Sequence, residues 1–153
     1  MRVLIAAVGR LRAGPLRDLY DDYMGRLPWN ADLREFEAAT GRSAAERQRR
    51  EADLILGAIP QGAVVVALDP RGRNLSSEDF ATQIGHWRDG GAGVLAFAIG
   101  GADGFDDRLR DEARLILSFG SLTWPHMLVR VMLAEQLFRA SSILSGHPYH
   151  RAG

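Results

Sequence analysis

The chain has 153 residues, 46% hydrophobic and 25% charged, which predicts one globular domain spanning residues 1–153. It contains no cysteine and no lysine, which excludes disulfides, thiolate metal sites, cysteine nucleophiles, lysine Schiff bases and lysine-dependent phosphate loops. All 19 basic residues are arginine and are balanced by 19 acidic ones, so a nucleic-acid surface would have to be a local patch.

Apolar segments along the chain are short. The N-terminal one, Val3–Val8, is shorter than the apolar core of a signal peptide, and none approaches the roughly 20 residues of a membrane-spanning helix. We therefore expect a cytoplasmic protein with no membrane partner. The lack of cysteine fits that reducing compartment.

The N-terminal third predicts a strand, a helix and a second strand. Val3–Val8 is continuously apolar and ends at Gly9, which is typical of a buried strand. Apolar residues then recur at helical spacing over residues 16–27, and Pro28 ends that helix. The poorly patterned segment 33–37 is assigned as a strand.

The middle third predicts a helix, a strand and a helix. A capping box opens segment 43–59 and predicts a helix over it. The apolar, β-branched run 63–68 is typical of a central parallel strand, which we expect the Asp-Pro-Arg-Gly sequence at 69–72 to end. A serine-capped helix follows over residues 76–87.

The C-terminal third begins with a second fully apolar strand at 94–99, which runs into the glycine-rich loop 100–105. A short charged helix at 106–114 and a strand at 115–117 follow. The last helix covers residues 125–145, with a proline in its first turn and a glycine after its end.

Five rounds of strand and helix predict an α/β fold, with a mostly parallel sheet and helices on both faces. Ligands of such sheets bind at the carboxyl ends of the strands. The loops at 69–75, 100–105 and 118–124 are therefore where a site is expected.

The sequence "GGADG" at 100–104 matches neither the dinucleotide fingerprint nor the lysine-dependent phosphate loop. Its glycines permit close backbone approach to a ligand, whereas Asp103 would repel a phosphate. The loop is either a tight turn or a backbone-lined site for a ligand that is not strongly anionic.

The loop "SFGSLTWP" is unusually apolar for a segment that follows a buried strand. Phe119, Leu122 and Trp124 either cap the hydrophobic core or form walls around a flat ring.

The last helix is apolar around nearly its whole circumference, so it must be buried on several sides. A homodimer interface would supply such burial, with Leu133 and Leu137 among its candidate contacts. Glu135 and Arg139, spaced i and i+4, can pair with each other.

The tail, "SGHPYHRAG" from Ser145, carries two of the four histidines. It is either a solvated terminus or part of a site. His147 and His150 have no carboxylate near them in the sequence, so we expect no metal, and the chain has no nucleophile-elbow motif of a serine hydrolase.

Three motifs carry a family resemblance. They are Leu68-Asp69 with Gly72, the "IGGADG" of Ile99 to Gly104, and "LTWPHMLVRVMLAEQLFRASSILSGHPYHR" from Leu122 to Arg151. In this order, over about 150 residues, they resemble the large-subunit ribosomal RNA methyltransferase H family of the SPOUT class across the whole chain. Two features depart from that family: Ala102 replaces the usual proline, and Ala152-Gly153 replaces an acidic last residue.

The resemblance implies an α/β fold with a C-terminal trefoil knot, and a homodimer. It further implies methyl transfer from S-adenosylmethionine to N3 of a pseudouridine in 23S, large-subunit rRNA on the assembled ribosome, without a metal. The cofactor residues that it implies are Leu68, Gly100, Phe119, Gly120, Ser121, Leu122, Thr123 and Trp124.

The catalytic candidates are His150, Tyr149, Arg151 and His126. Either His150 or His126 would take the N3 proton, Arg151 would stabilise charge or grip a phosphate, and Tyr149 would orient the base. We expect the tail to complete the partner subunit's site. The alternative is that His147 and Tyr149 merely pin the tail to the last helix.

Arginines 42, 47, 49 and 50 either contact RNA phosphates or form a solvated helix face. Two other functions stay open: a SPOUT methyltransferase acting on tRNA, and a non-catalytic dimer that binds the ribosome.

Overall fold

The computed structural model describes residues 1–151, and Ala152 and Gly153, the C-terminal departure noted above, lie outside the described residues. Strands and helices alternate along the chain, as predicted. The elements are β1 (Arg2–Val8), α1 (Pro15–Arg26), β2 (Asn30–Phe36), α2 (Ala44–Ala58), β3 (Val64–Asn74), α3 (Ser77–Asp89), β4 (Val94–Ile99), α4 (Asp107–Glu112), β5 (Leu115–Ser118) and α5 (His126–Ser145).

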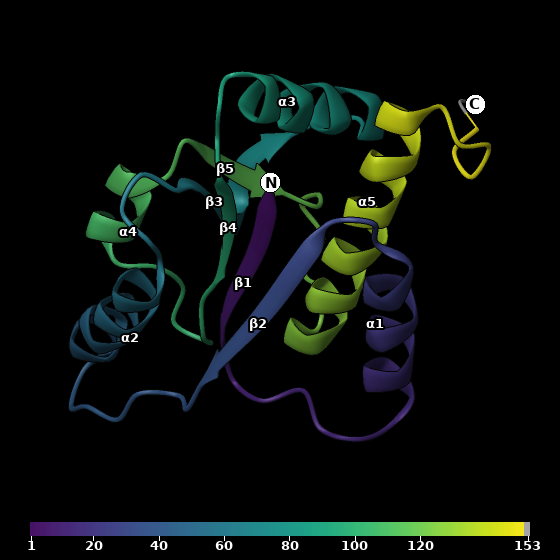
Figure 1. Cartoon of the computed structure of the whole chain (residues 1–153). Helices are drawn as coiled ribbons and strands as arrows, with labels where there is room; N and C mark the ends of the chain where they lie inside the picture. The colour runs from purple at the N-terminus through teal and green to yellow at the C-terminus, as the bar shows by residue number, and fades with distance from the viewer. Residues whose placement is uncertain (152–153) are drawn as a thin grey trace.

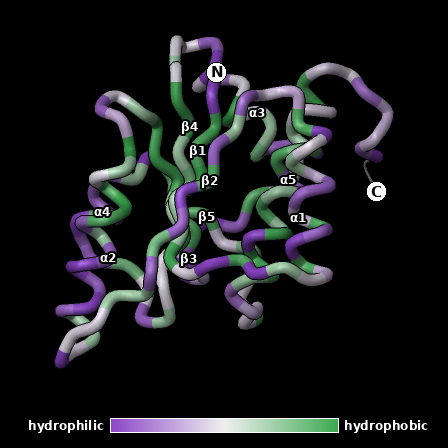
Figure 2. Tube along the Cα trace, turned by 60° about the horizontal axis from the view of Figure 1, so that its bottom comes forward, coloured by the Kyte–Doolittle hydropathy of each residue, from purple (hydrophilic) through white to green (hydrophobic). Residues whose placement is uncertain are grey.

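The five strands form one sheet in the order β2-β1-β4-β3-β5, and every neighbouring pair is parallel. Helices α1, α3 and α5 lie on one face, and α2 and α4 lie on the other (Figure 1). The expected α/β fold with helices on both faces is confirmed. Figure 2 shows the central strands as hydrophobic and much of α2 as hydrophilic.

Strand β3 is longer than predicted, because the segment 69–72 does not end it. After an irregularity between Leu68 and Arg73, the strand resumes its pairing with β5, so that Arg73 lies opposite Leu117 and Asn74 opposite Ser118. Gly72 lies so close to the β5 backbone that an added Cβ would be 2.5 Å from the carbonyl oxygen of Ile116. The proline and glycine therefore mark an irregularity within β3, which continues past its pairing with β4 and pairs there with β5, instead of a strand end.

Strand β2 begins earlier than predicted, at Asn30, and pairs residue by residue with β1 up to Phe36. It is an edge strand, and exposed residues interrupt its partly buried ones, which explains its weak apolar pattern. The predicted helix caps are present: Ser43 and Ser76 each accept a hydrogen bond from a backbone N–H of the following turn.

Helix α5 is buried largely by its own chain. It packs against α1, α3 and the sheet, and Leu133 and Leu137 are fully buried among the core residues of this face. They are therefore core residues and unsuitable probes of a dimer contact, contrary to the expectation from sequence. No helix within residues 1–151 is long and apolar enough to cross a membrane.

Candidate functional site

A cavity of about 530 Å³ lies at the carboxyl ends of β3, β4 and β5. Its walls come from the three loops singled out in the sequence, together with His126 and Val129 at the start of α5. The parallel order of the strands brings these loops to one edge of the sheet, although they are far apart in the chain.

Seven of the eight residues that the resemblance implies for the cofactor line this cavity. They are Leu68, Gly100, Phe119, Gly120, Leu122, Thr123 and Trp124. The eighth, Ser121, is exposed and is not part of the wall.

The apolar loop after β5 forms an open wall instead of a core cap. Leu122 is 72% exposed and Trp124 is 39% exposed, while Phe119 packs against the core. The Trp124 indole N–H donates to the carbonyl oxygen of Phe119 at 3.1 Å, which fixes the ring across the loop. Of the three apolar side chains in this loop, Phe119 alone caps the core, whereas Leu122 and Trp124 remain open to solvent beside the cavity.

The glycine-rich loop closes on itself, because Gly101 and Gly104 form an isolated bridge and Gly104 adopts a φ of +82°. Asp103 accepts two hydrogen bonds from Arg47, which holds the pKa of that carboxyl below its ordinary value. Since this carboxylate is already paired, the loop presents mainly backbone to the cavity.

His126 borders the cavity, and its Nε2 lies 2.8 Å from the carbonyl oxygen of Val8 at the end of β1. A carbonyl oxygen only accepts, so Nε2 carries the hydrogen in this contact and Nδ1 is the acceptor of the neutral ring. Nδ1 has no hydrogen-bond partner among residues 1–151. The ring is therefore oriented by β1 and offers one basic nitrogen.

Beneath this histidine lies an ion pair that sequence reasoning missed. Arg130 is fully buried and donates to Glu35 of β2 at 2.6 Å, and Glu35 also accepts from the backbone N–H of Leu11. Arg130 further donates to the carbonyl oxygens of Val8 and Gly9. Burial lowers the pKa of Arg130, an effect that the charge of Glu35 opposes. The only sequence signal was an arginine interrupting an apolar helix.

The tail lies at the opposite end of α5 from the cavity. A helix of 20 residues is about 30 Å long, so His150, Tyr149 and Arg151 are remote from the cavity of their own chain. The structure brings only His126, of the four catalytic candidates, to this cavity.

The tail is bound to its own subunit. The Tyr149 hydroxyl donates to Glu135 at 3.0 Å, and its ring packs edge-on against Phe138. Burial, with hydrogen bonding, raises the pKa of Tyr149 to about 12. His150 accepts from Arg139 through Nδ1 and, carrying its hydrogen on Nε2, donates to Glu78.

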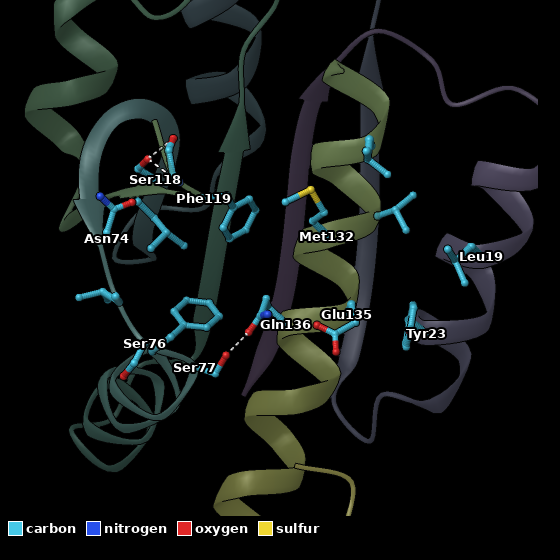
Figure 3. A pocket seen from close by; sticks show the side chains of 16 residues that line it. Leu19, Tyr23, Asn74, Ser76, Ser77, Ser118, Phe119, Met132, Glu135 and Gln136 are labelled. Carbon is cyan, nitrogen blue, oxygen red and sulfur yellow. Dashed lines mark hydrogen bonds between the residues drawn. The ribbon is translucent and has the colours of Figure 1, made fainter. Parts of the chain in front are cut away.

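A second, mainly apolar groove of about 560 Å³ runs between α1, the start of α3 and α5 (Figure 3). Leu19 and Tyr23 line it from α1, and Met132 and Glu135 line it from α5. It shares Leu117, Phe119 and Gly120 with the first cavity, so the two hollows lie on either side of one loop. Sequence patterning did not reveal this groove, because its residues come from separate elements.

The arginines at 42, 47, 49 and 50, which lie in α2 and just before it, are in part already paired. Arg47 binds Asp103 and Arg50 binds Glu46, while Arg42 and Arg49 are exposed. Within residues 1–151, no three histidine or carboxylate side chains lie together as a metal centre would require.

Known proteins that are similar to this chain are named as methyltransferases or methylases. A family described as "Predicted SPOUT methyltransferase" matches residues 1–150. A "Ribosomal RNA large subunit methyltransferase H" from Rhodospirillum centenum is 57% identical over 152 residues, covering 99% of this chain and 100% of that protein. One of the same name from Mesorhizobium japonicum is 51% identical over 160 residues, again covering 99% and 100%.

A solved structure, of a probable methylase family protein from Haemophilus influenzae, matches with a TM-score of 0.57 at 8% identity. The match covers 99% of this chain and 70% of that one, and at this identity it indicates a shared fold alone. Taken with the sequence matches over the full chain, the chain belongs to the ribosomal RNA large subunit methyltransferase H family of SPOUT methyltransferases.

Proposed function

We propose that the chain uses S-adenosylmethionine to methylate N3 of a pseudouridine in large-subunit ribosomal RNA. The names of its relatives support methyl transfer to large-subunit rRNA. The observation that carries the proposal is the cavity at the carboxyl ends of three parallel strands, lined by seven of the eight expected cofactor residues.

The cavity suits this cofactor in size and chemistry. Its volume lies within the range of about 300–1,000 Å³ that small-molecule sites occupy. Leu122 and Trp124 offer apolar surface for an adenine ring, and the 100–104 loop offers backbone donors and acceptors. S-adenosylmethionine, when bound, supplies an electrophilic sulfonium methyl and departs as a neutral thioether.

The target N3 carries a proton that must leave as the N3–methyl bond forms. We assign its removal to His126, which lines the cavity and whose Nδ1 is left as the acceptor while its Nε2–H is held by Val8. His150 is the weaker candidate, because its acceptor nitrogen is already hydrogen-bonded to Arg139. The role left for the tail is to hold the base: Arg151 neutralises charge and Tyr149 orients the ring.

The tail would perform this role in the other subunit of a homodimer. Its own cavity is about a helix length away, whereas the groove between α1 and α5 adjoins a cavity wall and is open to a second copy. Half-buried apolar residues there, such as Leu128 and Met132, supply a surface that a partner would cover.

Three finer points belong to the same proposal. The C-terminal part forms the family's trefoil knot; contact of the β5 end with the 69–74 segment, including a Ser118–Pro70 hydrogen bond, supports this. Exposed Arg42 and Arg49 contact RNA phosphates on the assembled ribosome. The protein acts in the cytoplasm, where ribosomes are.

Calorimetry with S-adenosylmethionine, followed by transfer of its labelled methyl group to ribosomes lacking the modification, tests the proposal. We expect saturable binding and incorporation into large-subunit rRNA. An absence of binding heat would instead favour a non-catalytic ribosome-binding dimer, and incorporation into tRNA would favour a tRNA methyltransferase.

A further inference from the structure

The 100–104 loop cannot hold its own shape with side chains. Three of its five residues are glycine, and Ala102 adds one methyl group. Its internal support is the Gly101–Gly104 bridge, with a hydrogen bond from the Gly104 N–H to the Gly101 carbonyl at 3.1 Å. Glycine loses much conformational freedom on ordering, so contacts from outside must fix this segment.

Helix α2 supplies those contacts from one face. The Arg47 guanidinium binds the Asp103 carboxylate through two hydrogen bonds, of 2.8 and 3.2 Å. The Gln48 side-chain amide donates to the carbonyl oxygen of Asp103. One turn on, Glu51 lies against Gly101, where an added Cβ would be 2.8 Å from Glu51 Oε1.

Glu51 is only 4% exposed, yet only one of its two carboxylate oxygens is hydrogen-bonded within residues 1–151. Its Oε2 accepts from the backbone N–H of Ala39 at 3.0 Å, whereas Oε1 has no hydrogen-bond partner within residues 1–151. A buried carboxylate oxygen without a partner is costly to maintain. This oxygen faces the backbone of the loop, and nothing in the fold of α2 itself requires a carboxylate there.

From these contacts we infer that Arg47, Gln48 and Glu51 are positioning residues, which hold the 100–104 loop in the shape that the cofactor needs. The inference rests on the function proposed above. It also gives a role to Glu51 Oε1, which accepts a hydrogen bond from the loop when the loop adjusts to bound cofactor.

These residues act on the loop and not on the core. The side chains of Arg47 and Asp103 are 33% and 25% exposed, and neither residue is buried in the core. One turn beyond Glu51, Ile55 anchors α2 in the same apolar cluster as Phe105, the residue after the loop. Loss of the ion pair should therefore free the loop while the helix stays docked.

The test measures cofactor affinity without RNA. We expect Arg47→Ala and Asp103→Ala each to raise the calorimetric Kd for S-adenosylmethionine about tenfold, and the double variant to do no more. Glu51→Gln should weaken binding as well, because glutamine replaces one of the two carboxylate oxygens by an NH2 donor, so the oxygen that meets the Ala39 N–H and the oxygen that faces the loop cannot both be kept. Arg50→Ala is the matched control, since Arg50 pairs with Glu46 on the same helix.

Hydrogen exchange of the cofactor-free protein gives an independent readout. Amides 100–105 should exchange faster in Arg47→Ala than in wild type, while protection of β1 and β4 stays unchanged. Unchanged Kd and unchanged exchange in Arg47→Ala would overturn the inference. So would a rise confined to the KM for ribosomes, which would make Arg47 an RNA contact. A wild type that does not bind the cofactor would instead refute the proposed function.

Discussion

The buried pair of Arg130 and Glu35 gives the sharpest stability prediction. Glu35→Ala would leave a fully buried guanidinium with carbonyl oxygens as its remaining partners, and its Nε has no partner within residues 1–151. Breaking a buried pair by removing one member costs about 3–5 kcal/mol. Glu35→Gln keeps the shape and one acceptor but loses the charge, which costs about 1.5–3 kcal/mol.

Urea unfolding at fixed protein concentration measures both values, since a dimer's stability depends on concentration. The matched control is Glu37→Ala just after the end of β2, where the Arg10–Glu37 pair is exposed and should contribute little. We also expect a lower rate of methylation, because the pair holds the Val8 carbonyl that orients His126. A Glu35→Ala protein within 1 kcal/mol of wild type, about the cost of an exposed pair, would refute the reasoning.

Three further predictions follow from the groove and the tail. Met132→Asp should convert the dimer to a monomer in light scattering at micromolar concentration, whereas Leu54→Asp, at an exposed position of α2, should not; a monomeric wild type would contradict the dimer. Deleting residues 147–153 should abolish methylation and leave cofactor binding intact, and a heterodimer of this truncation with Gly100→Val should keep about half activity if the tail serves the partner's site. No activity in that heterodimer would place each tail in its own site. Because burial raises the pKa of Tyr149 to about 12, tail docking is fully stable below the ordinary pKa of 10.0 and is lost as pH rises towards 12. Absorbance titration should show two tyrosines that ionise late, Tyr149 and the buried Tyr20, and the truncation should remove one of these two late ionisations. A truncation that instead removes an ionisation near 10.0 and leaves the late amplitude unchanged would disprove tail docking.

The order of elements could be predicted because it depends on local patterns. The runs at β1, β3 and β4 are apolar on both faces, and serine caps mark the starts of α2 and α3. The continuation of β3 past Pro70 could not be predicted, because it depends on pairing with β5, more than 40 residues away. A bulge within a strand and a strand end have the same residue types.

The site was predictable where it lies on loops after strands and unpredictable where it depends on packing. The resemblance located Leu68, Gly100 and the 119–124 loop, which the fold brings together. The Glu35–Arg130 pair and the Arg47–Asp103 pair join residues 95 and 56 positions apart, which no local spacing reveals. The apolar circumference of α5 indicated burial correctly, but its own chain provides most of that burial.

The central claim is tested most directly by mass spectrometry of RNA from a strain that lacks this protein. We expect one N3-methylated pseudouridine to disappear from large-subunit rRNA and to return when the wild-type chain is restored. The methyl group should not return with a chain truncated before His147. Unchanged large-subunit rRNA, or a methyl group lost from tRNA instead, would contradict the proposed rRNA methylation.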